Sequence, residues 1–253
     1  MLDIPRIPSQ PQERERAINA PFVVLALIMS FIAVHIGRSM LSFRSGLEFL
    51  ILFAFIPARY DASFLEGATV PGGMWADIWT FFTYTFLHGD WVHLTVNSIW
   101  MLAFGSAVAW RFGSLRFLVF SLLCSVGGAA VHLAMHFGQP IPVVGASAAI
   151  SGQMAAAIRF VFQPGAPLGL FRLGGPMAFR IPALPLTACL RDGRVIGFLV
   201  VWLITNILFG LGIVSMSGAG QAVAWEAHIG GFVTGLLLFP LFDPIRPARA
   251  RER

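Results

Sequence analysis

Four polar side chains that could form a hydrolytic site stand near the beginnings of three different apolar segments. They are His93 and Asn97 in one segment, Ser147 in the small-residue stretch VVGASAAISG, and His228 in a third. A serine hydroxyl becomes a nucleophile when a histidine takes its proton, and fixed hydrogen-bond donors stabilise the oxyanion that its attack creates. These residue types suffice for acyl transfer only if the segments that carry them are brought together.

The amino-acid composition places most of this chain in lipid. Of its 253 residues, 57% are hydrophobic and 11% are charged, whereas soluble domains carry about 25% charged residues. The net charge of +5 includes 17 arginines and no lysine. The arginines flank apolar runs instead of clustering among aromatic residues, so we expect the lipid bilayer and no nucleic acid as a partner. The two cysteines, Cys124 and Cys189, indicate neither a disulfide framework nor a metal site, and we expect no cofactor and no metal.

Six apolar runs each have roughly the ~20 residues that a membrane-spanning helix needs. The first is expected to be an uncleaved spanning helix, because no small-residue cleavage site follows it. We therefore predict an all-α polytopic membrane protein with a six-helix membrane domain at 20–241, a polar N-terminal tail at 1–19 and an Arg-rich tail at 242–253. The runs are 20–36, 92–110, 115–137, 144–162, 195–214 and 222–241.

The segment between the first two runs has a different character. Its apolar stretch at 47–56 is too short to cross a bilayer, and Pro57 and several charged residues follow it. Trp75 and Trp79 suit the headgroup boundary. We expect residues 37–90 to form a large amphipathic outer loop that lies in the membrane interface.

The arginine distribution predicts the orientation and, with it, the depth of the four polar residues. With the N-terminus inside, 14 of the 17 arginines fall on the inner side, so the positive-inside rule places both termini in the cytoplasm. The second, fourth and sixth spanning helices then begin at the outer surface. His93, Asn97, Ser147 and His228 all lie within the first two turns of these helices, in one layer just below that surface.

Three motifs carry a resemblance to a known family. They are HGDWVHLTVN at 88–97, GASA at 145–148 and AHIGGFVTG at 227–235. In this order and on these helices, they resemble the rhomboid family of intramembrane serine proteases, from about Trp79 to Pro240. The resemblance implies a rhomboid-like bundle with a Ser147–His228 dyad and with His93 and Asn97 as oxyanion donors. It also implies that the substrates are transmembrane segments of membrane proteins.

The chain departs from the family pattern at three positions. Ala148 follows the serine where many members have glycine, and Ser151 stands where some have a tyrosine that stacks on the catalytic histidine. Thr80 replaces the arginine of a Trp-Arg pair in the outer loop. These departures concern local packing, the hold on His228 and the anchoring of the loop, and none removes a reacting group.

Competing interpretations exist for several of these residues. Ser151 is a second candidate nucleophile, but it lies about 6 Å deeper than Ser147, farther from water. Glu226 is two residues from His228 on the same helix and so points to a different face; it is interpreted as a charge at headgroup level. His35, His132 and His136 end their helices and are interpreted as interfacial or packing residues. A zinc site of His88, His93 and His228 is disfavoured, because no HExxH motif is present.

The sequence thus predicts an intramembrane serine endopeptidase in a bacterial inner membrane, with a mitochondrial inner membrane as the alternative setting. The alternatives are a non-catalytic rhomboid-like protein that binds membrane clients, and a small transporter, which would need paired broken helices. Gly231 and Gly235 are expected to let the sixth helix approach the fourth closely. The fifth helix, with Trp202 and Phe209, is the expected gate for substrate, below a loop at 215–221.

Overall fold

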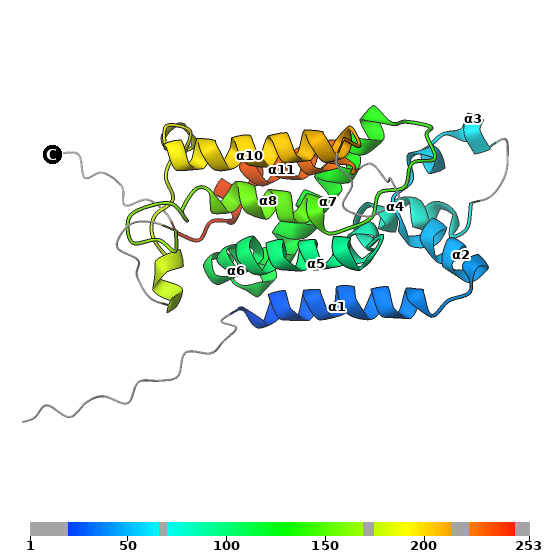
Figure 1. Ribbon diagram of the computed structural model, residues 1–253, viewed down its shortest axis with the longest axis horizontal. Helices are drawn as coiled ribbons and strands as arrows, with labels where there is room; N and C mark the ends of the chain where they lie inside the picture. The colour runs from blue at the N-terminus through cyan, green and yellow to red at the C-terminus, as the bar shows by residue number, and fades with distance from the viewer. Residues whose placement is uncertain (1–19, 66–69, 169–174, 214–222, 246–253) are drawn as a thin grey trace, which may run out of the picture.

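The computed structural model describes residues 20–65, 70–168, 175–213 and 223–245, and these residues form a helical bundle without any β-sheet (Figure 1). The predicted tail at 1–19, most of the tail at 242–253 and the loop at 215–221 lie outside the described residues. The longer helices are α1 (Phe22–Ser39), α2 (Phe43–Phe53), α4 (Gly73–Thr83), α5 (Trp91–Trp100), α6 (Ser106–Phe112), α7 (Ser114–Met135), α8 (Ser147–Ala157), α10 (Gly193–Gly210) and α11 (Trp225–Phe242).

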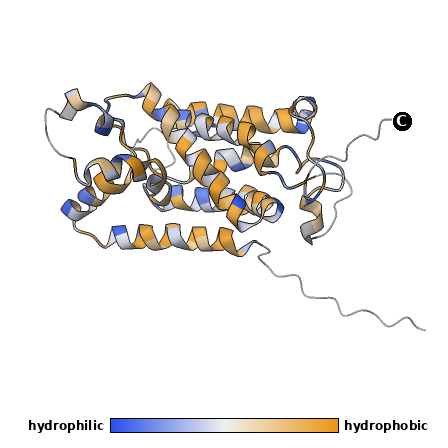
Figure 2. Ribbon diagram, turned by 180° about the vertical axis from the view of Figure 1, so that it is seen from behind, coloured by the Kyte–Doolittle hydropathy of each residue, from blue (hydrophilic) through white to orange (hydrophobic). Residues whose placement is uncertain are grey.

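Five helices are long and apolar enough to cross a membrane. They are α1, the continuous helix Trp91–Phe112 that joins α5 and α6 through one π-helical segment, α7, α10 and α11. Figure 2 shows hydrophobic residues along most of their turns. This confirms an all-helical polytopic membrane protein and five of the six predicted spans.

The predicted fourth span at 144–162 is wrong in its length. The helix here is α8, which has 11 residues, of which ten are buried. It lies between α10–α11 on one side and α5–α6 on the other (Figure 1). Because protein surrounds α8, its length is not set by the thickness of the bilayer, and irregular backbone at its ends is tolerated.

The outer segment is anchored through hydrogen bonds to its backbone carbonyls. Arg59 is buried and donates to the carbonyl oxygens of Ile51, at 2.7 Å, and Pro71, at 3.2 Å. Trp79 donates from its indole nitrogen to the carbonyl of Leu52, at 2.8 Å. Thr80, at the family's arginine position, is buried and donates to a carbonyl of its own helix. The buried guanidinium of the outer segment therefore comes from Arg59 and not from position 80, where the family pattern has an arginine.

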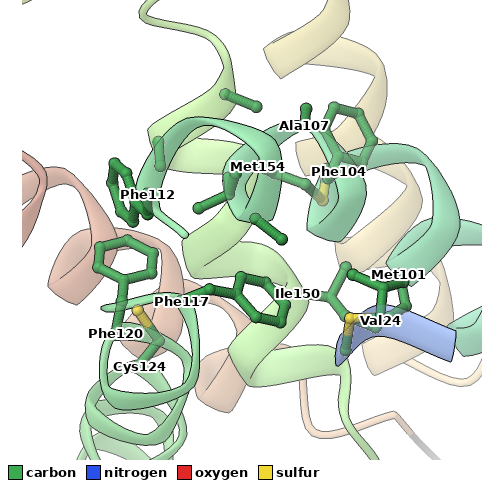
Figure 3. Packing of buried hydrophobic residues seen from close by; sticks show 14 of the residues in the cluster. Val24, Met101, Phe104, Ala107, Phe112, Phe117, Phe120, Cys124, Ile150 and Met154 are labelled. Atoms are coloured by element: carbon green, nitrogen blue, oxygen red, sulfur yellow. The ribbon is translucent and has the colours of Figure 1, made fainter. Parts of the chain in front are cut away.

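The core lies where α8 meets the surrounding helices. Figure 3 shows Ile150 and Met154 of α8 among Met101 and Phe104 of the second span, with Phe120 of α7 nearby. At the opposite end of the bundle from the outer segment, the buried guanidinium of Arg111 makes a two-pronged ion pair with Asp243, with both N···O distances at 2.9 Å. This pair ties the end of the second span to the end of α11.

Candidate active site

Ser147 is the first residue of α8, and the chain that leads into it is held in place from two sides. Val143 pairs with Phe55 of the outer segment through two backbone hydrogen bonds, and the Gly145 amide donates to the carbonyl of Tyr84 at 2.9 Å. No intrahelical carbonyl is available to the first N–H groups of a helix, which carry the positive end of its dipole. The serine hydroxyl and a set of orphan amides therefore share one location.

His228 lies in the first turn of α11, with Nε2 2.7 Å from Oγ of Ser147. Two glycines of α11 permit this approach. A Cβ on Gly231 would collide with the carbonyl of Ala148, and one on Gly235 would collide with the backbone of Gly152. The expected close packing of these two helices is thus present, and it brings a possible base to the serine hydroxyl.

The other ring nitrogen of His228 has a partner that sequence reasoning missed. Nδ1 of His228 lies in hydrogen-bond contact with Oδ1 of Asn206 on α10. The amide nitrogen of Asn206 donates to the carbonyl of Trp202 at 2.7 Å, which assigns the amide oxygen to the histidine. Nδ1 must then carry the proton, and Nε2 offers its lone pair to Ser147. This tautomer is the one that a general base requires.

His93 and Asn97 converge on the space beside Gly145. Gly145 has φ +112°, and a Cβ there would lie 2.6 Å from Nε2 of His93 and 3.2 Å from Nδ2 of Asn97. The amide of Gly89 donates to Nδ1 of His93 at 3.4 Å, which leaves the proton on Nε2. The Nδ2 group of Asn97 is buried and has no hydrogen-bond partner among the described residues. Two side-chain donors thus face the same small space near Ser147.

All four predicted site residues line one cavity of about 490 Å³, together with Asn206. Ser151 is buried, and its hydroxyl donates to the carbonyl of Ser147 at 2.8 Å, an ordinary contact for a serine within a helix. The geometry therefore favours Ser147 over Ser151 as the reacting hydroxyl.

Glu226 makes contacts that the sequence did not indicate. It is 4% exposed, and its carboxylate contacts His132 and His136 at the end of α7, so it faces protein and not headgroups. His88 is also buried, with its ring beside those of Phe31 and His93. These long-range contacts follow from helix packing, and the sequence carries no motif for them.

Comparison with known proteins identifies the family. The Rhomboid domain family model matches residues 76–243. An uncharacterized protein of Mycobacterium leprae is 28% identical over 169 residues, which is 65% of this chain and 56% of that protein. Uncharacterized proteins of Mycobacterium bovis and Mycobacterium tuberculosis are each 29% identical over 188 residues, 72% of this chain. This chain matches less than two thirds of the length of these relatives, 65% in the latter two. Because the family model covers most of the chain, this protein belongs to the rhomboid family.

Proposed function

We propose that this protein is an intramembrane serine endopeptidase that uses Ser147 and His228 to cleave transmembrane segments of membrane proteins. The observation that carries the proposal is the 2.7 Å contact between Oγ of Ser147 and Nε2 of His228 inside a cavity that His93 and Asn97 also line. A half-buried hydroxyl–imidazole pair with an oriented histidine is an arrangement that activates a serine nucleophile.

In the proposed reaction, Oγ of Ser147 attacks the peptide carbonyl carbon while Nε2 of His228 takes the hydroxyl proton. Asn206 accepts a hydrogen bond from Nδ1 and so holds the imidazole in position as it becomes charged. The carbonyl oxygen becomes an oxyanion, stabilised by the Ser147 amide together with His93 and Asn97. His228 then returns the proton to the leaving amine, and the C–N bond breaks. Water, deprotonated by His228, hydrolyses the acyl-enzyme and restores the serine.

The proposed setting is a bacterial plasma membrane with both termini in the cytoplasm. The arginine distribution supports this orientation, and the mycobacterial relatives support a bacterial membrane. A substrate helix hides its peptide bonds in its own hydrogen bonds, so it must unwind locally before Ser147 can reach it. We therefore expect substrates with helix-weakening Gly or Pro near the scissile bond.

A fluorophosphonate probe tests the proposal directly on the purified protein. Wild type should become covalently labelled and should cleave a reconstituted transmembrane substrate, whereas Ser147→Ala and His228→Ala should do neither. Ser151→Ala is the matched control, since it removes a hydroxyl one turn deeper on the same helix, and it should be labelled.

One result would count against the assigned nucleophile and another against the protease. Labelling that survives in Ser147→Ala but is lost in Ser151→Ala would move the nucleophile to Ser151. A folded wild type that resists the probe and binds membrane proteins without cleaving them would favour the non-catalytic, client-binding alternative.

A further inference from the structure

A second group of potential ligand residues lies away from the Ser147–His228 pair, at the junction of α7 and α11. His132 and His136 are one turn apart at the end of α7, and Glu226 is the second residue of α11. One ligand atom from each lies within 4.8 Å of the others. The side chains of His132 and Glu226 are 1% and 5% exposed, and that of His136 is 27% exposed.

Both imidazoles present a nitrogen to the same carboxylate oxygen. Nδ1 of His132 lies 2.6 Å from Oε1 of Glu226, and Nε2 of His136 lies 3.1 Å from it. The remaining nitrogens also face oxygen atoms. Nε2 of His132 is 3.4 Å from the carbonyl of Ile141, and Nδ1 of His136 is 3.1 Å from Oε1 of Gln139.

This arrangement places each ring between two acceptors, although a neutral imidazole has only one N–H to donate. If the outer nitrogens donate to Ile141 and Gln139, the lone pairs of both inner nitrogens point at the Glu226 carboxylate. Electron pairs converging on a carboxylate repel one another unless a cation lies among them. A metal-bound histidine commonly donates its other N–H to a carbonyl or amide oxygen in this way.

We propose that His132, His136 and Glu226 bind a divalent transition metal, with zinc as the best fit. Two imidazole nitrogens and one carboxylate oxygen are a donor set that zinc uses, with a fourth position left for water. Zinc–ligand bonds of about 2.0–2.1 Å put tetrahedral ligand atoms about 3.3 Å apart. Shifts of less than 1 Å in the two observed separations, 2.6 and 3.1 Å, would therefore admit the ion.

The site differs from the zinc alternative considered from sequence, which used His88, His93 and His228. Among the described residues, one group of three potential ligand side chains lies at metal-binding distance, and it consists of His132, His136 and Glu226. The proposed site departs from the expectation that the protein binds no metal. It links the last turn of α7 to the first turn of α11, two residues before His228, and it lines the same cavity as Ser147.

The test uses Ser147→Ala protein, so that its result does not depend on the proposed protease activity. The purified full-length protein is stripped with a chelator, incubated with zinc chloride and separated from free metal, and zinc per chain is then measured. We expect one zinc per chain and a higher melting temperature with zinc than without. Adding His136→Ala or Glu226→Gln should lower the affinity by more than about 100-fold, since even outer-shell changes cost 10–100-fold. Adding Glu48→Gln, which changes an exposed carboxylate on α2, should leave zinc binding unchanged.

Three outcomes would overturn the proposal. The first is a folded parent that retains no zinc above the buffer level. The second is undiminished zinc binding in the His136 and Glu226 variants, which would place the ion elsewhere, for example at His93 and His228. The third is retention of calcium but not zinc, which would exclude nitrogen ligands. Since the His136 side chain is partly exposed, His136→Ala should fold even if the Glu226 variant does not.

Discussion

Replacing Asn206 with alanine tests whether an amide on α10 positions the base of the proposed protease. Of the 18 residues of α10, only Val195 and Asn206 are buried, and Asn206 is the one whose side chain reaches His228. The substitution removes the acceptor for the Nδ1 proton and leaves Ser147, His93 and Asn97 in place. His228 could then rotate, or move its proton to Nε2, where it would no longer accept from the serine.

The expected loss can be worked out from this one hydrogen bond. A neutral hydrogen bond contributes about 0.5–1.5 kcal/mol, and one to a charged group about 1.5–3 kcal/mol. The bond strengthens as His228 becomes an imidazolium, so the transition state loses about 1–1.5 kcal/mol more than the ground state. At 1.36 kcal/mol per tenfold change in rate, kcat should fall about tenfold. Misorientation of the ring would deepen the loss toward 100-fold.

The assay is cleavage of one reconstituted transmembrane substrate, with kcat and KM determined separately. Asn206→Ala should lower kcat with little change in KM. Asn206→Asp keeps an oxygen toward His228 and should recover part of the loss. Thr205→Ala is the matched control, because Thr205 lines the same cavity and donates to a carbonyl one turn earlier, as Asn206 does, but its hydroxyl does not orient His228. The kcat of this variant should stay within about twofold of wild type.

The reasoning fails if Asn206→Ala cleaves at the wild-type rate. It also fails if the melting temperature falls and the Asp variant gives no recovery, because Asn206 would then serve packing alone. Equal losses in Asn206→Ala and Thr205→Ala would point to a general disturbance of α10.

Four further predictions follow from other contacts. Asn97→Ala should lower kcat by about 100-fold or more with an unchanged melting temperature, as for other oxyanion donors; a protein that unfolds in detergent would make Asn97 a packing residue. Trp202→Ala removes an aromatic contact between α10, the expected gate, and α11, in which the ring centroids lie 4.8 Å apart. The kcat/KM should therefore rise for a transmembrane substrate but not for a short soluble peptide, and equal effects on both substrates would place the gate elsewhere. Asp243→Ala leaves a buried guanidinium without its ion-pair partner and should cost about 3–5 kcal/mol in the free energy of unfolding, whereas Glu48→Ala at an exposed pair should cost at most about 1 kcal/mol. Burial, and to a smaller extent the nearby His93 ring, lowers the pKa of His88 from 6.5 to about 3. Between these two values only the unfolded chain protonates this residue, so the free energy of unfolding should fall as the pH drops below about 6.5, and His88→Phe should flatten this part of the plot of melting temperature against pH.

The bundle was largely predictable because hydrophobic length and arginine placement are local properties of the sequence. The bounds of α7 and α11 agree with the predicted runs to within a few residues, and α2 lies within the expected outer segment. The length of α8 was not predictable in the same way. The apolar run at 144–162 has the composition of a span, and only the packing of its neighbours shows that lipid does not set its ends.

Asn206 could have been found from the sequence, whereas the contact between His132 and Glu226 could not. Asn206 is a lone amide in an otherwise apolar run, and polar residues within a membrane are functional candidates, so it could have been singled out. The contact between His132 and Glu226 spans 94 residues and depends on how α7 and α11 face each other. Helical spacing correctly separates Glu226 from the face of His228 but does not reveal which neighbour it meets.

The shortness of α8 implies that the thickness of the bilayer helps to decide which peptide bond is cleaved in the proposed reaction. Its 11 residues extend about 16 Å at 1.5 Å per residue, roughly half of the ~30 Å hydrocarbon layer. Since α8 is too short to span the hydrocarbon layer and ten of its residues are buried in protein, the protein scaffold sets the depth of Ser147. A transmembrane substrate takes its depth from its own apolar length and from the lipid thickness. Each 1.5 Å of vertical shift of a substrate helix would then present the next residue to Ser147, and lipids of different chain length would select different peptide bonds.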